Sequence, residues 1–87
     1  MQPFLGDLLM GGIRLRDLCG LFVDVPAGDE SIWSGHFLVD NAKRGLFELG
    51  RPYLLMLDDG RSGRVVVTNL DDEPDDNALR VEFQPAR

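Results

Sequence analysis

The chain is poor in several residue types, and each shortage disfavours a class of protein. It has one cysteine, so it can form no internal disulfide bond and does not require an oxidising compartment. No apolar run approaches the ~20 residues of a membrane-spanning helix. The opening ten residues lack a basic segment and hold Asp7 within their apolar stretch, unlike a signal peptide. We therefore expect a cytoplasmic protein without a membrane segment.

Positive charge is also scarce. Nine basic residues, of which Lys43 is the only lysine, face fifteen acidic ones, and the net charge is −6. This sign opposes nucleic acid and anionic membranes. A stacking platform for single-stranded nucleic acid would have to use Trp33 with Arg14, Arg16 and Arg64. Because these arginines are not interleaved with aromatic residues, we expect no nucleic-acid partner. A protein partner or a second copy of the chain suits this composition better.

The length allows one domain, which we assign to residues 1–87. Hydrophobic residues make up 44% and charged residues 28% of the chain, which is typical of a folded globular protein. A domain of this size buries roughly 60–65% of the surface that its unfolded chain exposes, so its stability is small. Association into a homodimer is a common way to add stability.

The clearest local signal is a β-hairpin over Tyr53–Thr68. Asp59-Gly60 is typical of a two-residue turn, and a four-residue loop over 59–62 is the alternative. Both give the same faces, since they differ by two residues in register. One predicted face carries Leu54, Met56, Val65 and Val67, and we regard it as a candidate interaction surface. The other carries Tyr53, Leu55, Leu57 and Val66 with Arg64 and Thr68. Two apolar faces indicate a sandwich or a closed barrel.

Two further segments alternate as half-buried strands. In residues 32–40 the inward positions are Trp33, Phe37 and Val39, and the outward ones are Ser34, His36, Leu38 and Asp40. In residues 78–83 the inward positions are Leu79, Val81 and Phe83, and the outward ones are Arg80 and Glu82. We expect loops over 26–31 and 71–77. We expect a connector over 41–51, whose Leu46, Phe47 and Leu49 close one end of the core.

The first 25 residues have two interpretations. Phe4, Leu5, Leu8 and Leu9 fit a short helix that stops at Gly11-Gly12. A hairpin turning at the same glycines places Leu8, Met10, Ile13 and Leu15 on one face and Asp7 opposite Arg16. This charge pairing favours strands, and Gly20 then bends the chain into residues 21–25. The predicted fold is an all-β, small closed or partly open barrel of six to seven short antiparallel strands, with a short N-terminal helix as the alternative.

Ser34, His36 and Asp40 share a strand face and are the only candidates for a nucleophile, base and orienting acid. Neighbouring same-face residues lie about 6.6–6.8 Å apart, so Ser34 reaches His36 but Asp40 is two steps further away. A triad also needs oxyanion donors, and the chain has no G-x-S-x-G motif. We therefore interpret this set as a polar strand face and expect no catalytic residues.

Two combinations invite comparison with metal sites. Cys19 and His36 supply only two of the four ligands that structural zinc requires, and we expect Cys19 to be a small buried residue. The acidic positions Asp71, Glu73, Asp75, Asn77 and Glu82 match the spacing of a calcium loop. That loop lacks its glycine, contains Pro74 and has no flanking helices. No metal or cofactor is expected.

The remaining interpretation is a non-catalytic binding module for a protein partner or for itself. The alternative is a small-anion or nucleotide sensor that uses the turn Arg61-Ser62-Gly63-Arg64, with Arg61, Ser62 and Arg64 as ligands. This turn precedes no helix and has no Walker lysine, so it is not a P-loop. A third class, an enzyme, depends on Ser34 and His36.

Overall fold

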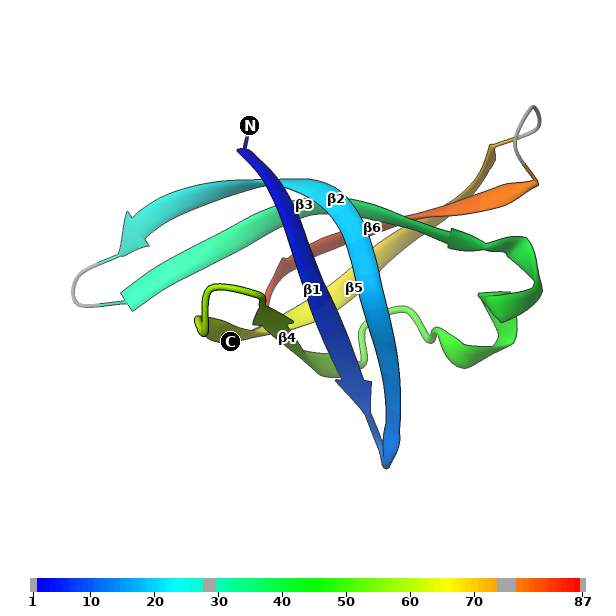
Figure 1. The fold of residues 1–87 in the computed structure, drawn as a ribbon, viewed down its shortest axis with the longest axis horizontal. Coiled ribbons are helices and arrows are strands. Elements are labelled where there is room, and N and C mark those ends of the chain that lie inside the picture. Colours follow the sequence, from blue (N-terminus) through cyan, green and yellow to red (C-terminus); the bar gives the residue numbers. More distant parts are fainter. Residues whose placement is uncertain (1, 28–29, 74–76, 87) are drawn as a thin grey trace.

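The computed structural model describes residues 2–27, 30–73 and 77–86. Within these residues six strands and one short 3-10 helix follow in the order β1 (Gln2–Met10), β2 (Ile13–Ala27), β3 (Glu30–Asp40), η1 (Asn41–Leu46), β4 (Pro52–Leu57), β5 (Ser62–Glu73) and β6 (Ala78–Pro85) (Figure 1). The strands close a barrel in the order β1-β2-β3-β6-β5-β4. The predicted all-β antiparallel barrel is confirmed.

The barrel consists of two three-stranded meanders that η1 connects. The pairs β3–β6 and β1–β4 join the meanders and close the sheet, and every neighbouring pair is antiparallel. Because the sheet closes into a barrel, the strand edges that a small open sheet would expose are paired with one another. The β2–β3 and β5–β6 hairpins extend beyond the barrel on opposite sides (Figure 1). In the described part of the chain, no helix is long and apolar enough to cross a membrane.

The N-terminal segment forms a hairpin, so the strand interpretation is correct and the helical alternative is wrong. Gly11 and Gly12 have φ angles of 55° and 93°, as a two-residue type I′ turn requires. Met10 pairs with Ile13 across this turn, as predicted. Ile13 is nevertheless 46% exposed, because it lies at the tip of the hairpin.

A β-bulge interrupts this hairpin. The pairing of β1 with β2 shifts by one residue near Asp7, so that Arg16 and Asp17 both lie opposite it. Asp17 has a left-handed backbone with φ 58°. The Asp7 carboxylate forms its ion pair with Arg14, at 2.7 Å, rather than with the predicted Arg16.

The β4–β5 hairpin forms where it was predicted, but its register differs by one residue from that of the predicted two-residue turn and by three residues from that of the four-residue loop. Tyr53 pairs with Val65. The Leu57 amide donates to the Arg61 carbonyl at 2.7 Å, and Gly60 has φ 95°. These contacts define a three-residue turn over 58–60 that ends in a left-handed glycine.

A shift by an odd number of residues exchanges the faces of a strand, so the four residues of the predicted interaction surface do not share one face. Val65 and Val67 are each 1% exposed and face the core. Leu54 and Met56 lie on the outer face, where Leu54 is 37% exposed. One face of this hairpin, rather than both, belongs to the core.

Strands β2, β3 and β5 run further than predicted. In the region expected to be a loop, Pro26 pairs with Ser31 and Ala27 with Glu30. Asp71–Glu73 likewise pairs with β6. Positions 28–29 and 74–76 of the expected loops lie outside the described residues. Backbone pairing along a hairpin does not depend on apolar side chains, so it extends past the residues that alternate.

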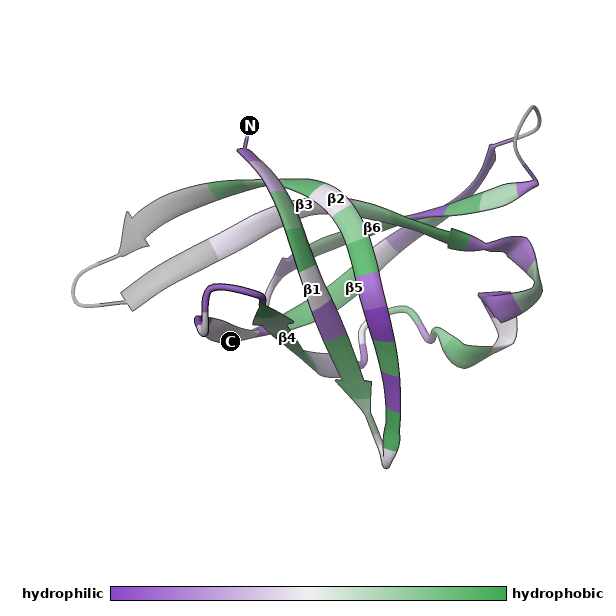
Figure 2. Ribbon diagram, viewed as in Figure 1, coloured by the Kyte–Doolittle hydropathy of each residue, from purple (hydrophilic) through white to green (hydrophobic). Residues whose placement is uncertain are grey.

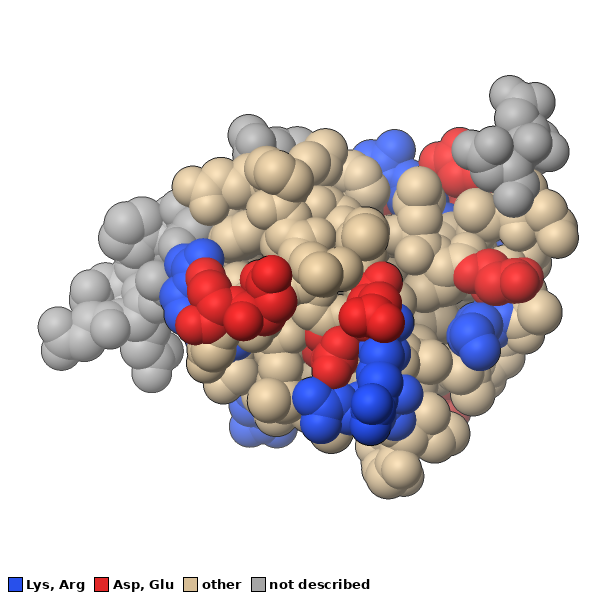
Figure 3. Space-filling model, in the orientation of Figure 1, with Lys and Arg blue, Asp and Glu red and all other residues tan. Residues whose placement is uncertain are grey.

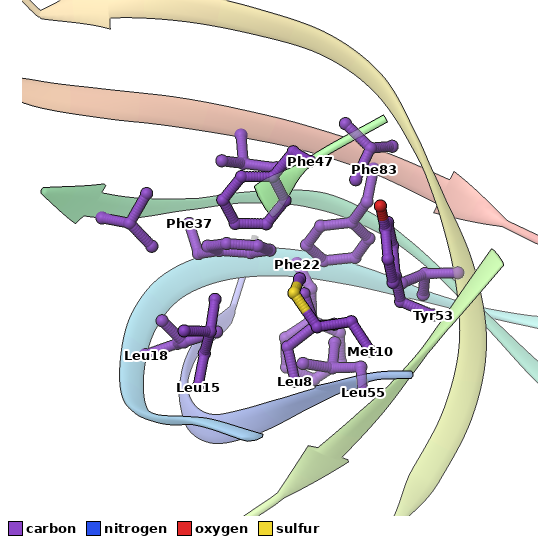
Figure 4. Close-up of a cluster of buried hydrophobic side chains, with 14 of the residues drawn as sticks. Leu8, Met10, Leu15, Leu18, Phe22, Phe37, Phe47, Tyr53, Leu55 and Phe83 are labelled. Carbon is purple, nitrogen blue, oxygen red and sulfur yellow. The ribbon is translucent and has the colours of Figure 1, made fainter. Parts of the chain in front are cut away.

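Aromatic rings fill much of the core (Figure 4). Phe22, Phe37 and Phe83 are at most 2% exposed, and the ring centroids of Phe37 and Phe83 are 6.0 Å apart. Trp33 is buried, as predicted. Phe47 from the connector is also buried and closes one end of the core.

Two predictions about single side chains are wrong. Leu49 is 62% exposed instead of packing into the core, and only Leu46 and Phe47 of the connector contact it. Cys19 is exposed, because it occupies an outward position of β2 between the inward residues Leu18 and Gly20.

Two glycines allow β2 and β3 to approach closely. A Cβ atom on Gly20 would lie 2.1 Å from the His36 carbonyl oxygen, and one on Gly35 would lie 2.1 Å from that of Leu21. Both glycines occupy inward positions on the paired strands. The strand β2 continues through Gly20, so this residue does not end a strand; it provides space for the neighbouring backbone.

Candidate functional site

The predicted polar face of β3 is present but does not form a catalytic relay. Ser34, His36 and Asp40 all lie on the outer face. In the part of the chain that the structure describes, no hydrogen bond joins these three side chains. The Asp40 carboxylate instead accepts from the Ala42 amide at 3.0 Å and caps η1. Partial burial, and next the charge of Arg80, lower the pKa of His36 below its ordinary value.

The predicted anion-binding turn is divided between two faces. The Arg61 guanidinium lies over the rings of Phe22 and Trp33, 5.8 Å and 6.0 Å from their centroids. It also pairs with Asp59 at 2.9 Å. Ser62 and Arg64 alternate with the inward residues of β5 and are exposed on the outer face. The structure therefore does not bring Arg61, Ser62 and Arg64 together.

The Asp59 carboxylate organises this turn. It accepts hydrogen bonds from the backbone amide and from Nε of Arg61, at 3.0 Å and 2.9 Å. The backbone hydrogen bond is the main reason why the pKa of Asp59 lies below its ordinary value. The arrangement holds the arginine over the end of the aromatic core.

The described residues of the acidic segment over 71–77 belong to the β5–β6 hairpin. Asp71 and Glu73 belong to β5, while Glu82 belongs to β6 and accepts a hydrogen bond from Asn69 at 3.1 Å. Asp75 lies outside the described residues. Across the described ranges, no three His, Cys, Asp or Glu side chains gather in a way that could hold a metal ion.

The outer face of β1, β2 and β3 carries a group of exposed apolar side chains. Four of them are 36–45% exposed, and together with the exposed Cys19 they form what we call the apolar strip: Leu5, Cys19, Leu21, Val23 and Leu38. Leu5, Cys19 and Leu38 form one cross-strand row, and Leu21 and Val23 follow along β2. Figure 3 shows uncharged surface over the crossing of β1 and β2, and Figure 2 shows that the ribbon there is mostly hydrophobic.

Charged side chains of both signs border the apolar strip. On β6, Arg80 lies opposite Leu38 of β3, and Glu82 lies opposite His36 of β3. At the bulge, the Asp7–Arg14 ion pair lies one outward position beyond Leu5. Each border therefore presents an acid and an arginine.

A groove of about 460 Å³ opens beside the bulge, where β2 separates from β3. We call it the β2–β3 groove. Its lining consists of Arg14, Leu15, Arg16, Asp17, Leu18, Leu38, Val39, Asp40 and Lys43. A smaller hollow of about 270 Å³ lies on the β1–β4 side and shares Asp7, Arg14 and Asp17 with the region of the bulge. The bulge therefore lies between two concave surfaces.

Sequence reasoning missed both surfaces. Leu38 was recognised as an apolar residue on a polar strand face, which is a signal for an exposed apolar position. The groove has no comparable signal, because it depends on the bulge at Asp17 and on where the pairing of β2 with β3 begins.

Comparison with protein families, curated proteins and solved structures gives no match for this chain.

Proposed function

We propose that the protein is a non-catalytic binding module that associates with a second copy of itself through the apolar strip. The observation that carries this proposal is the grouping of Leu5, Leu21, Val23 and Leu38 on three adjacent strands. Scattered exposed hydrophobic residues are ordinary, but a contiguous group with a polar rim is typical of an interaction site. A cytoplasmic location, which the single cysteine favours, is part of this proposal.

A second copy fits the borders of the strip. In a two-fold symmetric contact the same patch meets itself, so each border must complement its own symmetry mate or the opposite border. Because both borders carry an acid and an arginine, such a contact pairs opposite charges. The core of the contact remains uncharged, as in other homodimer interfaces.

The overall charge gives this association a characteristic salt dependence. Two copies that each carry −6 repel one another at long range. Added salt screens this repulsion, while burial of the apolar strip is little affected. Self-association should therefore strengthen with salt, whereas binding of a basic protein partner would weaken.

The test is sedimentation velocity between about 1 μM and about 1 mM, a range that corresponds to roughly −8 to −4 kcal/mol of association free energy. We expect a reversible dimer in the wild type and a monomer for Leu21→Glu, which places like charges across the two-fold axis. Leu49→Glu, on the exposed connector, makes the same change away from the strip and should still dimerise. Leu21→Ser serves as a milder variant.

A wild type that stays monomeric up to about 1 mM would overturn self-association. A dimer that Leu21→Glu and Leu21→Ser leave intact would place the contact elsewhere. Thermal melts of each variant confirm that the barrel is folded before its mass is interpreted.

A further inference from the structure

The barrel has a local gap in its hydrogen-bonded wall. Among the described residues, the pairing of β2 with β3 begins at Cys19–Leu38. In the segment 13–18 of β2, positions 13–15 and 18 pair with β1 alone, and the bulged positions 16 and 17 lie outside the regular pairing. On the other side of the gap, Val39 and Asp40 of β3 pair only with β6. The β2–β3 groove occupies the space between these two strand edges.

The bulge explains why the gap exists. Asp17 adopts a left-handed backbone two positions before the first β2–β3 pair. A bulge bends its strand and increases the local twist, so β2 turns away from β3 at this point. Alternate residues of an edge segment direct their N–H and C=O groups away from the paired neighbour. Part of the β2 backbone is therefore available to another strand.

The lining matches a strand with alternating side chains. Its floor is apolar and consists of Leu15, Leu18 and Val39, which are 6–9% exposed. Its rim carries Arg16 and Lys43, for which no ion pair occurs among the described residues.

Two of the three other charged groups of the lining are already engaged. Arg14 is paired with Asp7, and the Asp40 carboxylate caps η1. The Asp17 carboxylate has no ion pair among the described residues, so the lining as a whole carries three cations and two acids. Cations therefore outnumber acids in the lining, and Arg16 and Lys43 are the two of them that no ion pair engages.

From these observations we infer that the β2–β3 groove binds an extended acidic peptide, which adds a strand to the free edge of β2 at positions 13–18. Backbone hydrogen bonds supply affinity in such strand addition, and alternate side chains supply specificity. Apolar side chains of the peptide face the floor, and carboxylates on the other side face Arg16 and Lys43. At about 3.4 Å per residue, the free edge accommodates a peptide of about five to six residues.

Fluorescence anisotropy with a labelled, capped peptide Glu-Val-Glu-Val-Glu-Val tests this inference. We expect saturable binding, which Lys43→Glu weakens by about five- to tenfold, as expected for reversing one rim charge. Arg64→Glu makes the same change in net charge on the exposed face of β5, outside the groove, and should weaken binding by less than about twofold. The peptide Lys-Val-Lys-Val-Lys-Val should not bind.

The backbone contribution has its own readout. N-methylation of alternate peptide residues removes the N–H donors along one edge of the peptide strand. Binding should be abolished when that edge is the one that faces β2. Amide hydrogen exchange should show added protection in residues 13–18 when the unmodified peptide is bound. Leu21→Glu, which tests the apolar strip, should leave peptide affinity unchanged, so the two proposals fail separately.

Three results would overturn this inference. The first is no binding of the acidic peptide at about 1 mM. The second is equal weakening by Lys43→Glu and Arg64→Glu, which would mean attraction by overall charge alone. The third is binding without new protection in residues 13–18, which would place the peptide elsewhere.

Discussion

The backbone amide of Asp17 donates a hydrogen bond to the carboxylate of Asp7, with 3.1 Å between Asp17 N and Asp7 Oδ1. The second carboxylate oxygen accepts from Nε of Arg14 at 2.7 Å. A bulged residue lies outside the regular ladder, so its amide needs another acceptor. Asp7 provides one and holds Asp17 at φ 58°. One carboxylate therefore stabilises the bulge that opens the β2–β3 groove.

The left-handed backbone of Asp17 can be tested by substitution. This conformation costs a non-glycine residue roughly 1–2 kcal/mol, and β-branched residues tolerate it least. We expect Asp17→Val to lower the free energy of unfolding by about 1–2 kcal/mol. Asp17→Gly should change it by less than about 1 kcal/mol, because relief of strain offsets the entropy of glycine. Urea denaturation measures both, and equal stabilities would show that the left-handed backbone is not required.

The Asp7 contacts predict a dependence of stability on pH. The Arg14 side chain, and next the Asp17 amide, hold the pKa of Asp7 below its ordinary value. As pH falls, the unfolded chain takes up this proton before the folded chain does. The stabilisation is therefore complete above the ordinary aspartate pKa of 3.8 and is lost as pH falls through the lower pKa of the folded protein.

We accordingly expect Asp7→Asn to be less stable than the wild type at pH 7, and expect the difference to shrink below about pH 4. Asp58→Asn is the matched control, since the Asp58 carboxylate makes no hydrogen bond or ion pair with the described residues. Its difference from the wild type should be small at both pH values. A stability difference between Asp7→Asn and the wild type that does not change with pH would contradict the role of the Asp7 charge.

The sequence predicted the strands that have one face in the core and one in water. Trp33 and Phe37 alternate with polar neighbours, and the alternation alone identifies the inward face. The β4–β5 faces were predicted wrongly because residues 54–57 and 65–67 are continuous apolar runs. Such runs carry no period-two signal, so the turn alone decided the register. The turn sequence Asp58-Asp59-Gly60 fits more than one loop length.

The two proposed surfaces depend on contacts between distant parts of the chain. Arg16 and Lys43 are 27 positions apart, and they line one groove because β2 leaves β3 at the bulge and η1 begins where β3 ends. Local composition does not show where two strands stop pairing. Leu5 and Leu38 likewise come to lie on either side of Cys19 only through the register of β1, β2 and β3.

The β4–β5 register itself predicts a contrast between two adjacent leucines. Leu55 is fully buried, whereas Leu54 is 37% exposed on the outer face. Leu55→Ala should cost about 2–5 kcal/mol, since it removes core contacts and leaves a cavity. Leu54→Ala should cost less than about 1 kcal/mol, because less of its surface is removed from water. Thermal or urea unfolding measures both, and the reverse order would restore the face that the sequence predicted.

The close approach of β2 and β3 predicts a contrast between two glycines. A Cβ atom at Gly35 would lie 2.1 Å from the Leu21 carbonyl oxygen and 2.7 Å from the Phe22 Cα, and backbone atoms cannot rotate away. Gly35→Ala should therefore lower the free energy of unfolding by about 2 kcal/mol or more, at the upper end of overpacking costs.

Gly45→Ala is its matched control, because Gly45 lies in η1 with no atom within 4 Å of the added Cβ. Its alanine should be neutral or stabilise the fold by about 0.4–1 kcal/mol, since it restricts the unfolded chain. If Gly35→Ala does not fold, Gly20→Ala repeats the test on the opposite strand, where the added Cβ would meet the His36 carbonyl oxygen at 2.1 Å. Wild-type stability in a folded Gly35→Ala variant would mean that β2 and β3 lie further apart than the structure places them.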